Sequence, residues 1–427
     1  MDEWELVIQQ ITNELNNGHY EQALSKLVAS EVLAAEDGER LMDMAELYFQ
    51  LGHVEDAERV TDKLLELDHS TIEPLLMKVE IAIQREQWDE AIQWLENARA
   101  IDADHPEMLV TSADCYRAMG LPEVALTFLE QLVEQHPTVP FYWLALGLTQ
   151  LENGDAHTAI KSLTRAYELD DQDADIAESL ARALIEAGEW EASLPYLTAA
   201  LTMRPDDTKL ALTKAVLHYR LGDTDEAIDQ LTRLKQLEPE NSDIFAQLGE
   251  IQLTLGRIAD AKDSWEKVHS LNPHDSHAML ALARIAQREQ KWQVALDYFH
   301  RALEAGDERD DILIGIAESY QEMGKWQEAL QYYEQIGTMG DGPLPAGIYR
   351  NMAHCHAQLE SYEAAIACLE KERRTSDDPA LYNELADLYW LTGQRKEACD
   401  CWRASLTADS HQWDVAELYE RNCISAE

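Results

Sequence analysis

Residues 242–275 read SDIFAQLGEIQLTLGRIADAKDSWEKVHSLNPHD. This stretch predicts two short amphipathic helices joined by a tight turn. In its first half, Phe245, Leu248 and Gly249 follow the i, i+3, i+4 spacing of one helix face. Gly256 provides the residue without a Cβ that a tight turn favours, and Pro273 stops the second helix from continuing. The stretch is therefore one helix–turn–helix unit of 34 residues.

The same unit recurs along nearly the whole chain. Aligned on the inter-helix turn, the units start at residues 4, 38, 72, 106, 140, 174, 208, 242, 276, 310, 346 and 379. Most units have a small residue at position eight, where two helices must approach closely: Ala45, Ala113, Gly147, Ala181, Ala215, Gly249, Ala283, Ala317, Ala353 and Ala386. All units but one, which has Ser193, carry alanine at position twenty. Repetition at a fixed period of this size predicts a solenoid.

The 34-residue pattern, with Trp143, Gly147, Ala159 and Pro273 at matching registers, resembles the tetratricopeptide repeat (TPR) family. The resemblance implies an all-α fold, an α-solenoid in which about twelve helix pairs form a right-handed superhelix. It further implies a long, TPR-only bacterial protein, with the first helix of each pair lining a concave groove for a peptide or helix. The groove positions are two, five, nine, twelve and thirteen.

The predicted organisation has four parts. Residues 1–336 hold repeats 1–10, and residues 346–410 hold repeats 11 and 12. Between them, residues 337–345 (GTMGDGPLP) contain three glycines and two prolines, which predicts a loop and a hinge. Residues 411–427 space Trp413, Ala416 and Tyr419 along one stripe, as expected for a C-terminal capping helix.

Composition restricts the kind of partner. The chain has 34 basic and 82 acidic residues, a formal charge of -48, which repels nucleic acid and anionic lipid and favours basic or neutral partners. The alternative is that the charge serves solubility. An acidic N-terminus argues against a signal peptide, and no apolar run is long enough to span a membrane. Six cysteines in 427 residues do not suggest a disulfide framework, so we expect a reducing cytoplasm.

Catalytic and metal signatures are missing. No Walker, dinucleotide-binding, GxSxG or HExxH motif occurs, so we expect no enzymatic activity, no catalytic residues and no cofactor. Histidines and cysteines gather near the C-terminus without CxxC or i, i+4 spacing, which predicts partly buried filler residues rather than a metal site. They are His354, Cys355, His356, Cys368, Cys399, Cys401 and Cys423.

The groove positions carried over from the family give an acidic and apolar zone in repeats 1–4. Residues 1–105 hold 25 acidic and 7 basic side chains, so the local field is negative. This combination suits a basic amphipathic helix, with apolar contacts for affinity and carboxylates for steering. The alternative is a solvated acidic face. The predicted partner-binding residues are Met42, Glu46, Phe49, Leu76, Glu80, Ile83 and Asp114.

A second, basic zone occupies the groove positions of repeats 6–9. Arginine suits the capture of carboxylates, so the zone predicts either a site for an acidic peptide or small anion, or an internal salt ladder. For the ladder, Arg182 lies between Glu178 and Glu186, and Arg284 lies at the same position as Glu250 and Glu318. The residues of the zone are Arg182, Lys209, Tyr219, Arg220, Arg284 and Arg288.

We therefore expect a non-enzymatic cytoplasmic scaffold or adaptor that binds a protein or peptide, without nucleic acid or membrane insertion. The alternative is a ligand-responsive regulator acting through the basic zone. Trp390 stands at a groove position and predicts either a ligand anchor or a residue buried under the capping helix. The family's carboxylate clamp is not matched, and Arg350 with Asn351 is its nearest approach.

Overall fold

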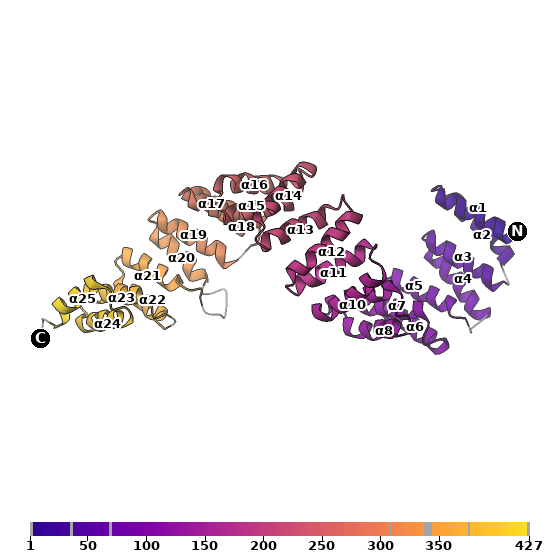
Figure 1. Cartoon of the computed structure of the whole chain (residues 1–427), viewed down its shortest axis with the longest axis horizontal. Coiled ribbons are helices and arrows are strands. Elements are labelled where there is room, and N and C mark those ends of the chain that lie inside the picture. Colours follow the sequence, from indigo (N-terminus) through magenta and orange to yellow (C-terminus); the bar gives the residue numbers. More distant parts are fainter. Residues whose placement is uncertain are drawn as a thin grey trace. The chain divides into compact units, whose positions relative to one another are not determined.

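The computed structural model describes residues 3–34, 37–67, 71–307, 309–336, 344–374 and 376–424. These residues form helices and turns, with no strand among them (Figure 1). The chain divides into two compact units, Met1–Leu217 and His218–Glu427, and each is described by itself. The division falls within helix α13 (Thr208–Arg220).

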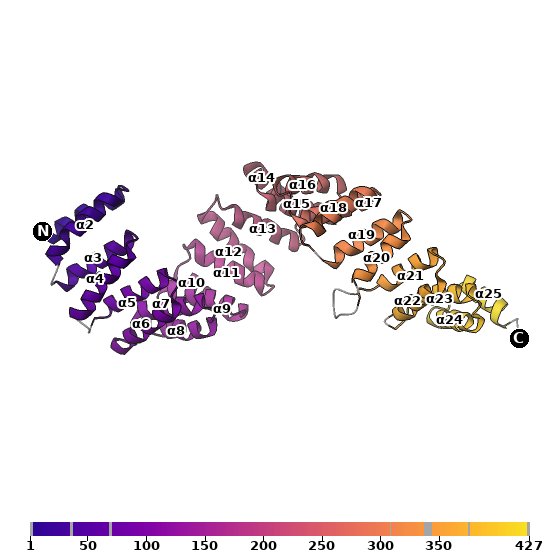
Figure 2. The same ribbon diagram turned by 180° about the vertical axis from the view of Figure 1, so that it is seen from behind.

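Unit 1 is a succession of antiparallel helix pairs, in which each pair packs on the next (Figure 2). Its helices before α13 are α1 (Glu3–Asn16), α2 (Tyr20–Ala34), α3 (Gly38–Gln50), α4 (Val54–Leu67), α5 (Glu73–Gln84), α6 (Trp88–Ile101), α7 (Pro106–Ala118), α8 (Pro122–Gln135), α9 (Pro140–Glu152), α10 (Ala156–Leu169), α11 (Ala174–Glu186) and α12 (Trp190–Met203).

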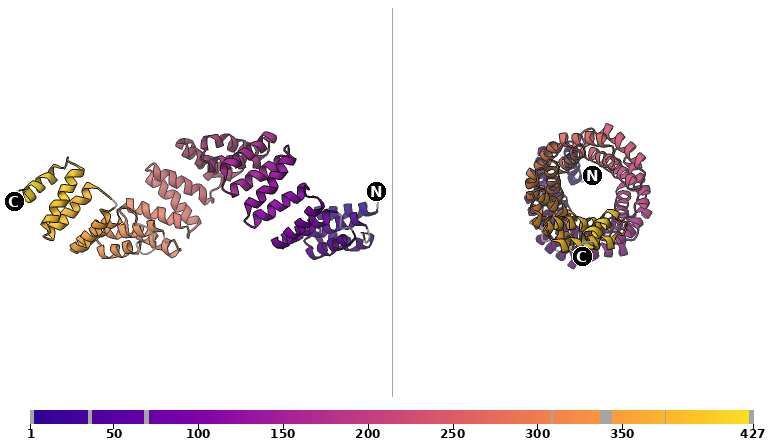
Figure 3. Two further views of the ribbon diagram at one scale, coloured as in Figure 1. Left: turned by 90° about the horizontal axis from the view of Figure 1, so that it is seen from below. Right: turned by 90° about the vertical axis from the view of Figure 1, so that its left-hand side faces the viewer.

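Unit 2 continues the same pattern and ends in a shorter segment (Figure 3). Its helices after α13 are α14 (Thr224–Leu237), α15 (Ser242–Thr254), α16 (Ile258–Leu271), α17 (Ser276–Arg288), α18 (Trp292–Glu304), α19 (Asp310–Glu322), α20 (Trp326–Ile336), α21 (Ile348–Gln358), α22 (Tyr362–Glu372), α23 (Pro379–Leu391), α24 (Arg395–Ala408), α25 (Trp413–Tyr419) and the π-helix η1 (Glu420–Ile424).

The helix starts agree with the predicted repeat starts to within two residues, which confirms an all-α solenoid; the described ranges hold twelve helix pairs followed by a C-terminal helix. The predicted hinge falls at residues 337–345, of which 337–343 lie outside the described residues. The domain boundaries predicted around it therefore stay a prediction.

The turns inside the pairs explain why glycine recurs there. Gly256 has φ +72, in the left-handed region that side chains with a Cβ rarely adopt. Most pairs place glycine at this point, but Glu86, Gln290 and Glu360 adopt φ between 57 and 59 in its place. These three turns are built at a conformational cost.

Close packing between paired helices explains the small residues at position eight. A Cβ on Gly249 would lie 2.6 Å from Nε1 of Trp265, which is buried on the facing helix α16. The position-twenty alanines Ala57, Ala91 and Ala261 have no exposed surface. The core of each unit therefore follows the seam between the two helices of every pair.

The end of the chain departs from one expectation. Cys399 on α24 and Cys423 on η1 form a disulfide, with their Cα atoms 5.8 Å apart. The interpretation of these two cysteines as filler was wrong, because the end segment folds back and brings them together across 24 positions of sequence. The expected cytoplasmic location rested partly on the cysteines and stays a prediction.

Candidate partner-binding site

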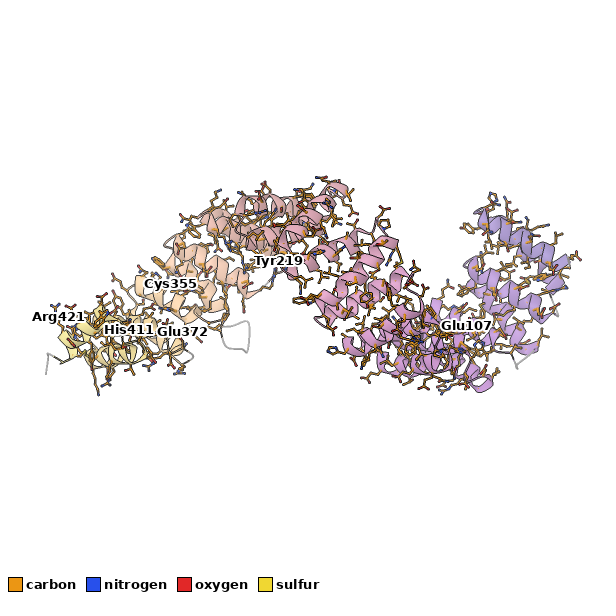
Figure 4. All side chains as sticks on the ribbon, in the orientation of Figure 1. Glu107, Tyr219, Cys355, Glu372, His411 and Arg421 are labelled. Atoms are coloured by element: carbon orange, nitrogen blue, oxygen red, sulfur yellow. A yellow bond between two sulfur atoms is a disulfide. The ribbon has the colours of Figure 1, made fainter. Side chains whose placement is uncertain are left out.

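Unit 1 contains an open hollow of about 350 Å³ between α3, α5 and α7, which are the first helices of three successive pairs. Carboxylates and apolar side chains share its wall, and we call it the acidic hollow. Its lining residues are Met42, Glu46, Phe49, Gln50, Glu73, Leu76, Met77, Glu80 and Glu107. The last of these lies on α7 (Figure 4).

The repeat period assembles this hollow. Residues separated by one repeat occupy the same place on successive first helices, and α3 packs directly against α5. Glu46 and Glu80 are one repeat apart, as are Glu73 and Glu107. Glutamates from two different positions of the repeat therefore line the same hollow.

The floor of the hollow is apolar and belongs to the core. Leu76 and Met77 are buried, with 7% and 4% of their surface exposed. Met42 and Phe49 are half-buried and pack against the core of the first pairs. An apolar side chain of a partner would contact these packed side chains. Because packing already fixes their rotamers, they would lose little conformational entropy on binding.

The carboxylates of the hollow are not neutralised by a basic side chain among the described residues. Within the described ranges, Glu46, Glu73, Glu80 and Glu107 form no ion pair with a basic side chain. Glu80 keeps exposed surface, but the surrounding wall partly desolvates its carboxylate and raises its pKa, and the charges of Glu107 and Glu46 raise it further. Burial, Asp43 and Glu107 likewise raise the pKa of Glu46. The hollow is therefore a place where a positive charge would be stabilised.

Five of the seven residues predicted for this zone line the hollow, and two do not. Ile83 is half-buried against the neighbouring core. Asp114 instead forms an ion pair with Arg117, with 3.2 Å between Oδ1 of Asp114 and Nη1 of Arg117. Arg117 also forms an ion pair with Glu152. Burial raises the pKa of Asp114 in spite of this partner. Glu107 was missed, although its position two of the fourth repeat is the signal that could have found it.

The basic zone is distributed over both units. In unit 1, Arg182 and Lys209 are exposed. The hydrogen bond from Arg117 lowers the pKa of Glu152, and the charge of Arg182 adds to this effect. Glu178, expected beside Arg182, instead accepts a hydrogen bond from Nη2 of Arg204 (2.6 Å).

In unit 2, Tyr219 is half-buried, whereas Arg220, Arg284 and Arg288 are exposed. Arg284 pairs with Asp311 of the next repeat (2.9 Å). Burial raises the pKa of Glu318, and the charge of Arg284 offsets part of this rise. Arg284 therefore has an acidic partner in its own unit, although this partner is not Glu250.

A second hollow, of about 400 Å³, lies among α19, α21, α22 and α23 in unit 2. Its lining includes Arg350 and Asn351, named above as the nearest approach to a carboxylate clamp, together with Asp387. Nε of Arg350 donates to Glu384 (2.9 Å) and Nη1 donates to Asp378 (2.9 Å). Because two carboxylates already hold this guanidinium, it is not available to bind an anion.

The remaining candidates from the sequence are Trp390 and the cysteines near the C-terminus, and Trp390, Cys355 and Cys401 pack in or against the core. Trp390 is half-buried, 5.4 Å from the ring of Trp402, with the guanidinium of Arg395 stacked 3.4 Å from its ring centre. Burial raises the pKa of the Cys355 and Cys401 thiols to about 11.

In the part of the chain that the structure describes, no group of three or more His, Cys, Asp or Glu is arranged to hold a metal ion. None of the described helices has the length and apolar character needed to cross a bilayer.

Comparison with solved structures finds helical-repeat proteins. Cut9, in the APC/C hetero-tetramer Cut9–Hcn1, is 12% identical with a TM-score of 0.43, over 99% of this chain and 97% of that one. PilF of Pseudomonas aeruginosa is 23% identical with a TM-score of 0.43, over 51% and 97%. YrrB, described as a TPR protein with an unusual peptide-binding site, is 21% identical with a TM-score of 0.37, over 44% and 96%. A comparison with curated proteins found no match.

Family models match most of the chain. The model of the cytochrome c-type biogenesis protein H TPR domain matches residues 120–245. Models of the tetratricopeptide repeat match residues 82–147, 246–310, 312–343, 346–371 and 379–404. Proteins built from this repeat generally mediate protein–protein interactions. These matches, together with the twelve helix pairs, show that the chain belongs to the tetratricopeptide repeat family.

Proposed function

We propose that unit 1 binds a basic amphipathic helix of a partner protein in the acidic hollow and holds it without acting on it chemically. The observation that supports this most directly is the gathering of Glu46, Glu80 and Glu107 over an apolar floor with no cation among them. A structural salt network would provide its own lysine or arginine. Here the compensating charge is left for a partner.

Charge and shape favour a helix with two unlike faces. A lysine or arginine side chain that enters the hollow relieves the repulsion among the glutamates, and its hydrocarbon stem can lie along Phe49 and Leu76. Apolar residues one helical turn away would then cover the same floor. Carboxylates at the rim attract the partner and set its orientation, whereas apolar burial provides most of the affinity.

A titration with a defined probe tests the proposal. The probe is a synthetic helical peptide with lysines on one face and leucines on the other, titrated into the full-length chain at moderate salt. Glu46→Lys should weaken its binding at least tenfold, because the variant puts a like charge in the hollow. Phe49→Ala should also weaken binding by removing part of the floor.

The matched control is Glu130→Lys, which makes the same change of net charge on the exposed surface of α8. It should reduce the affinity by less than a factor of three, since exposed charges at a distance are screened. Helical content, measured by circular dichroism, should be the same in all variants. Equal losses for Glu46→Lys and Glu130→Lys would show that only the overall charge matters and would overturn the assignment.

A further inference from the structure

The last helix of the chain is held weakly by its own packing. Residues 413–424, here called the C-terminal cap, comprise α25 and η1. No residue of α25 is buried, and Trp413 exposes 79% of its surface. Among the side chains of the cap that the structure describes, Val415, Tyr419 and Cys423 pack, half-buried, against the core of the last repeat. A helix of seven residues has little stability of its own in water.

Two attachments compensate for this weak packing, one at each end of the cap. At the beginning, Nδ2 of Asn383 donates to Oε1 of Gln412 (2.6 Å), and Nε2 of Gln412 donates to Oγ of Ser405 (3.0 Å). At the far end, the Cys399–Cys423 disulfide joins the cap covalently to α24. Arg421 of the cap is labelled in Figure 4.

The chemistry of the neighbouring thiols separates this bridge from the other cysteines. Cys399 and Cys423 are both half-buried, so each residue keeps part of its surface open to solvent. Cys115, Cys355, Cys368 and Cys401 are buried free thiols. Cys401 is two residues from Cys399, but burial raises its pKa to about 11, so it is a poor competitor in thiol–disulfide exchange. Exchange is therefore directed to one pair.

We propose that the Cys399–Cys423 bridge is a reversible fastening that couples the redox state of the surroundings to the position of the C-terminal cap. When the bridge is reduced, η1 and then α25 separate from α24, and the apolar side of the last repeat, which includes Trp402, becomes accessible. When the bridge forms again, the cap closes over this side.

The reductant is a dithiol. Its thiolate attacks one sulfur of the bridge, forms a mixed disulfide and releases the other sulfur as a thiolate, which takes up a proton. The second thiol of the reductant then displaces the remaining protein sulfur. Two electrons and two protons pass to the protein, Cys399 and Cys423 become thiols, and the reductant becomes a disulfide.

The first measurement establishes which cysteines exchange. The full-length protein is treated with oxidised glutathione or with dithiothreitol, alkylated without denaturation and digested for mass spectrometry. We expect a linked Cys399–Cys423 peptide only after oxidation, and alkylation of both residues after reduction, with the four buried thiols protected. The absence of a linked peptide after oxidation would overturn the proposal.

The second measurement follows the cap itself. Amide hydrogen exchange of residues 413–424 should become at least tenfold faster on reduction, whereas exchange of α15 and α16 should not change. Cys423→Ser should exchange at the fast rate under both conditions, and Cys399→Ser provides the same test should the first variant fold poorly. Cys368→Ser, which replaces a buried free thiol of the same region, should retain the redox difference. Identical exchange in the two redox states of the wild type would show that the bridge has no such role.

Discussion

Beyond the effect of desolvation, the carboxylate of Glu107 raises the pKa of Glu80, although the two residues belong to different repeats and lie 27 positions apart in sequence. The same carboxylate also raises the pKa of Glu46. Three successive repeats thus direct like charges at one hollow, an arrangement that destabilises the free protein. A natural explanation is that the destabilisation is relieved when a cationic partner binds.

Glu80→Gln should make the free protein more stable at neutral pH and its complex weaker. A carboxyl group whose pKa is raised by folding contributes stability below its unfolded pKa, and that contribution is lost as pH rises through the folded pKa. At pH 7 the ionised Glu80 therefore costs stability, and its removal should gain a few tenths of a kcal/mol, since solvent screens this exposed side chain. Thermal unfolding at pH 7 measures the gain, and peptide titration measures the loss of affinity. A variant that is less stable and binds equally well would contradict the account.

Binding of the lysine–leucine peptide should release protons at mildly acidic pH. Just above the ordinary glutamate pKa of about 4.3, Glu46 and Glu80 hold more protons in the free protein than an ordinary glutamate does, because their pKa values are raised. An inserted cation lowers these pKa values and expels the protons. Affinity should therefore increase with pH over this range and become constant at neutral pH. Calorimetry in two buffers of different ionisation enthalpy counts the protons, and Glu46→Gln with Glu80→Gln should remove the release.

The turn that joins the helices of a pair predicts opposite effects for two substitutions. Gln290 adopts φ 58, where a side chain with a Cβ is strained, so Gln290→Gly should stabilise the chain by about 0.5–1 kcal/mol. Gly256 adopts φ +72, and Gly256→Ala should destabilise it by about 1 kcal/mol. Thermal or denaturant unfolding of both variants checks the two signs. A stabilising Gly256→Ala would show that the backbone does not hold this conformation.

Gly249→Ala should destabilise the chain, even though alanine is the better helix former. The new Cβ would lie 2.6–2.9 Å from three atoms of the Trp265 ring, which must shift inside a buried seam. Overpacking of this kind costs about 1–3 kcal/mol, against about 1 kcal/mol gained in helix propensity. In a Trp265→Leu background the same substitution should cost less, because the clashing ring is gone. An unchanged cost in that background would place the effect elsewhere.

Much of the structure could be predicted because position within the repeat determines surroundings. The spacing of Gly256 and Pro273 locates the helix ends in their repeat. The position that Glu46 and Glu80 share in successive repeats predicts that both lie in the same hollow. Asp114 was placed there by register too, but its side chain pairs with Arg117, a neighbour that the groove positions do not distinguish. The Cys399–Cys423 bridge was not predictable from spacing, because it depends on how the end segment folds back on α24.

The same limit applies to the arginines. Position nine placed Arg284 in line with Glu250 and Glu318, yet its ion pair is made with Asp311, at position two of the next repeat. A long side chain can reach either neighbour, and sequence register alone does not decide between them. Side-chain pairing on a charged surface is therefore harder to predict than the helices that carry it.

The central claim concerns where a partner binds, and hydrogen exchange of the full-length chain with and without the lysine–leucine peptide tests it most directly. The account predicts that α3, α5 and α7 become protected together, that α15 and α17 do not change, and that Glu46→Lys abolishes the protection. Protection outside α3, α5 and α7, or protection of the same helices that survives in Glu46→Lys, would contradict the assignment of the acidic hollow as the binding site.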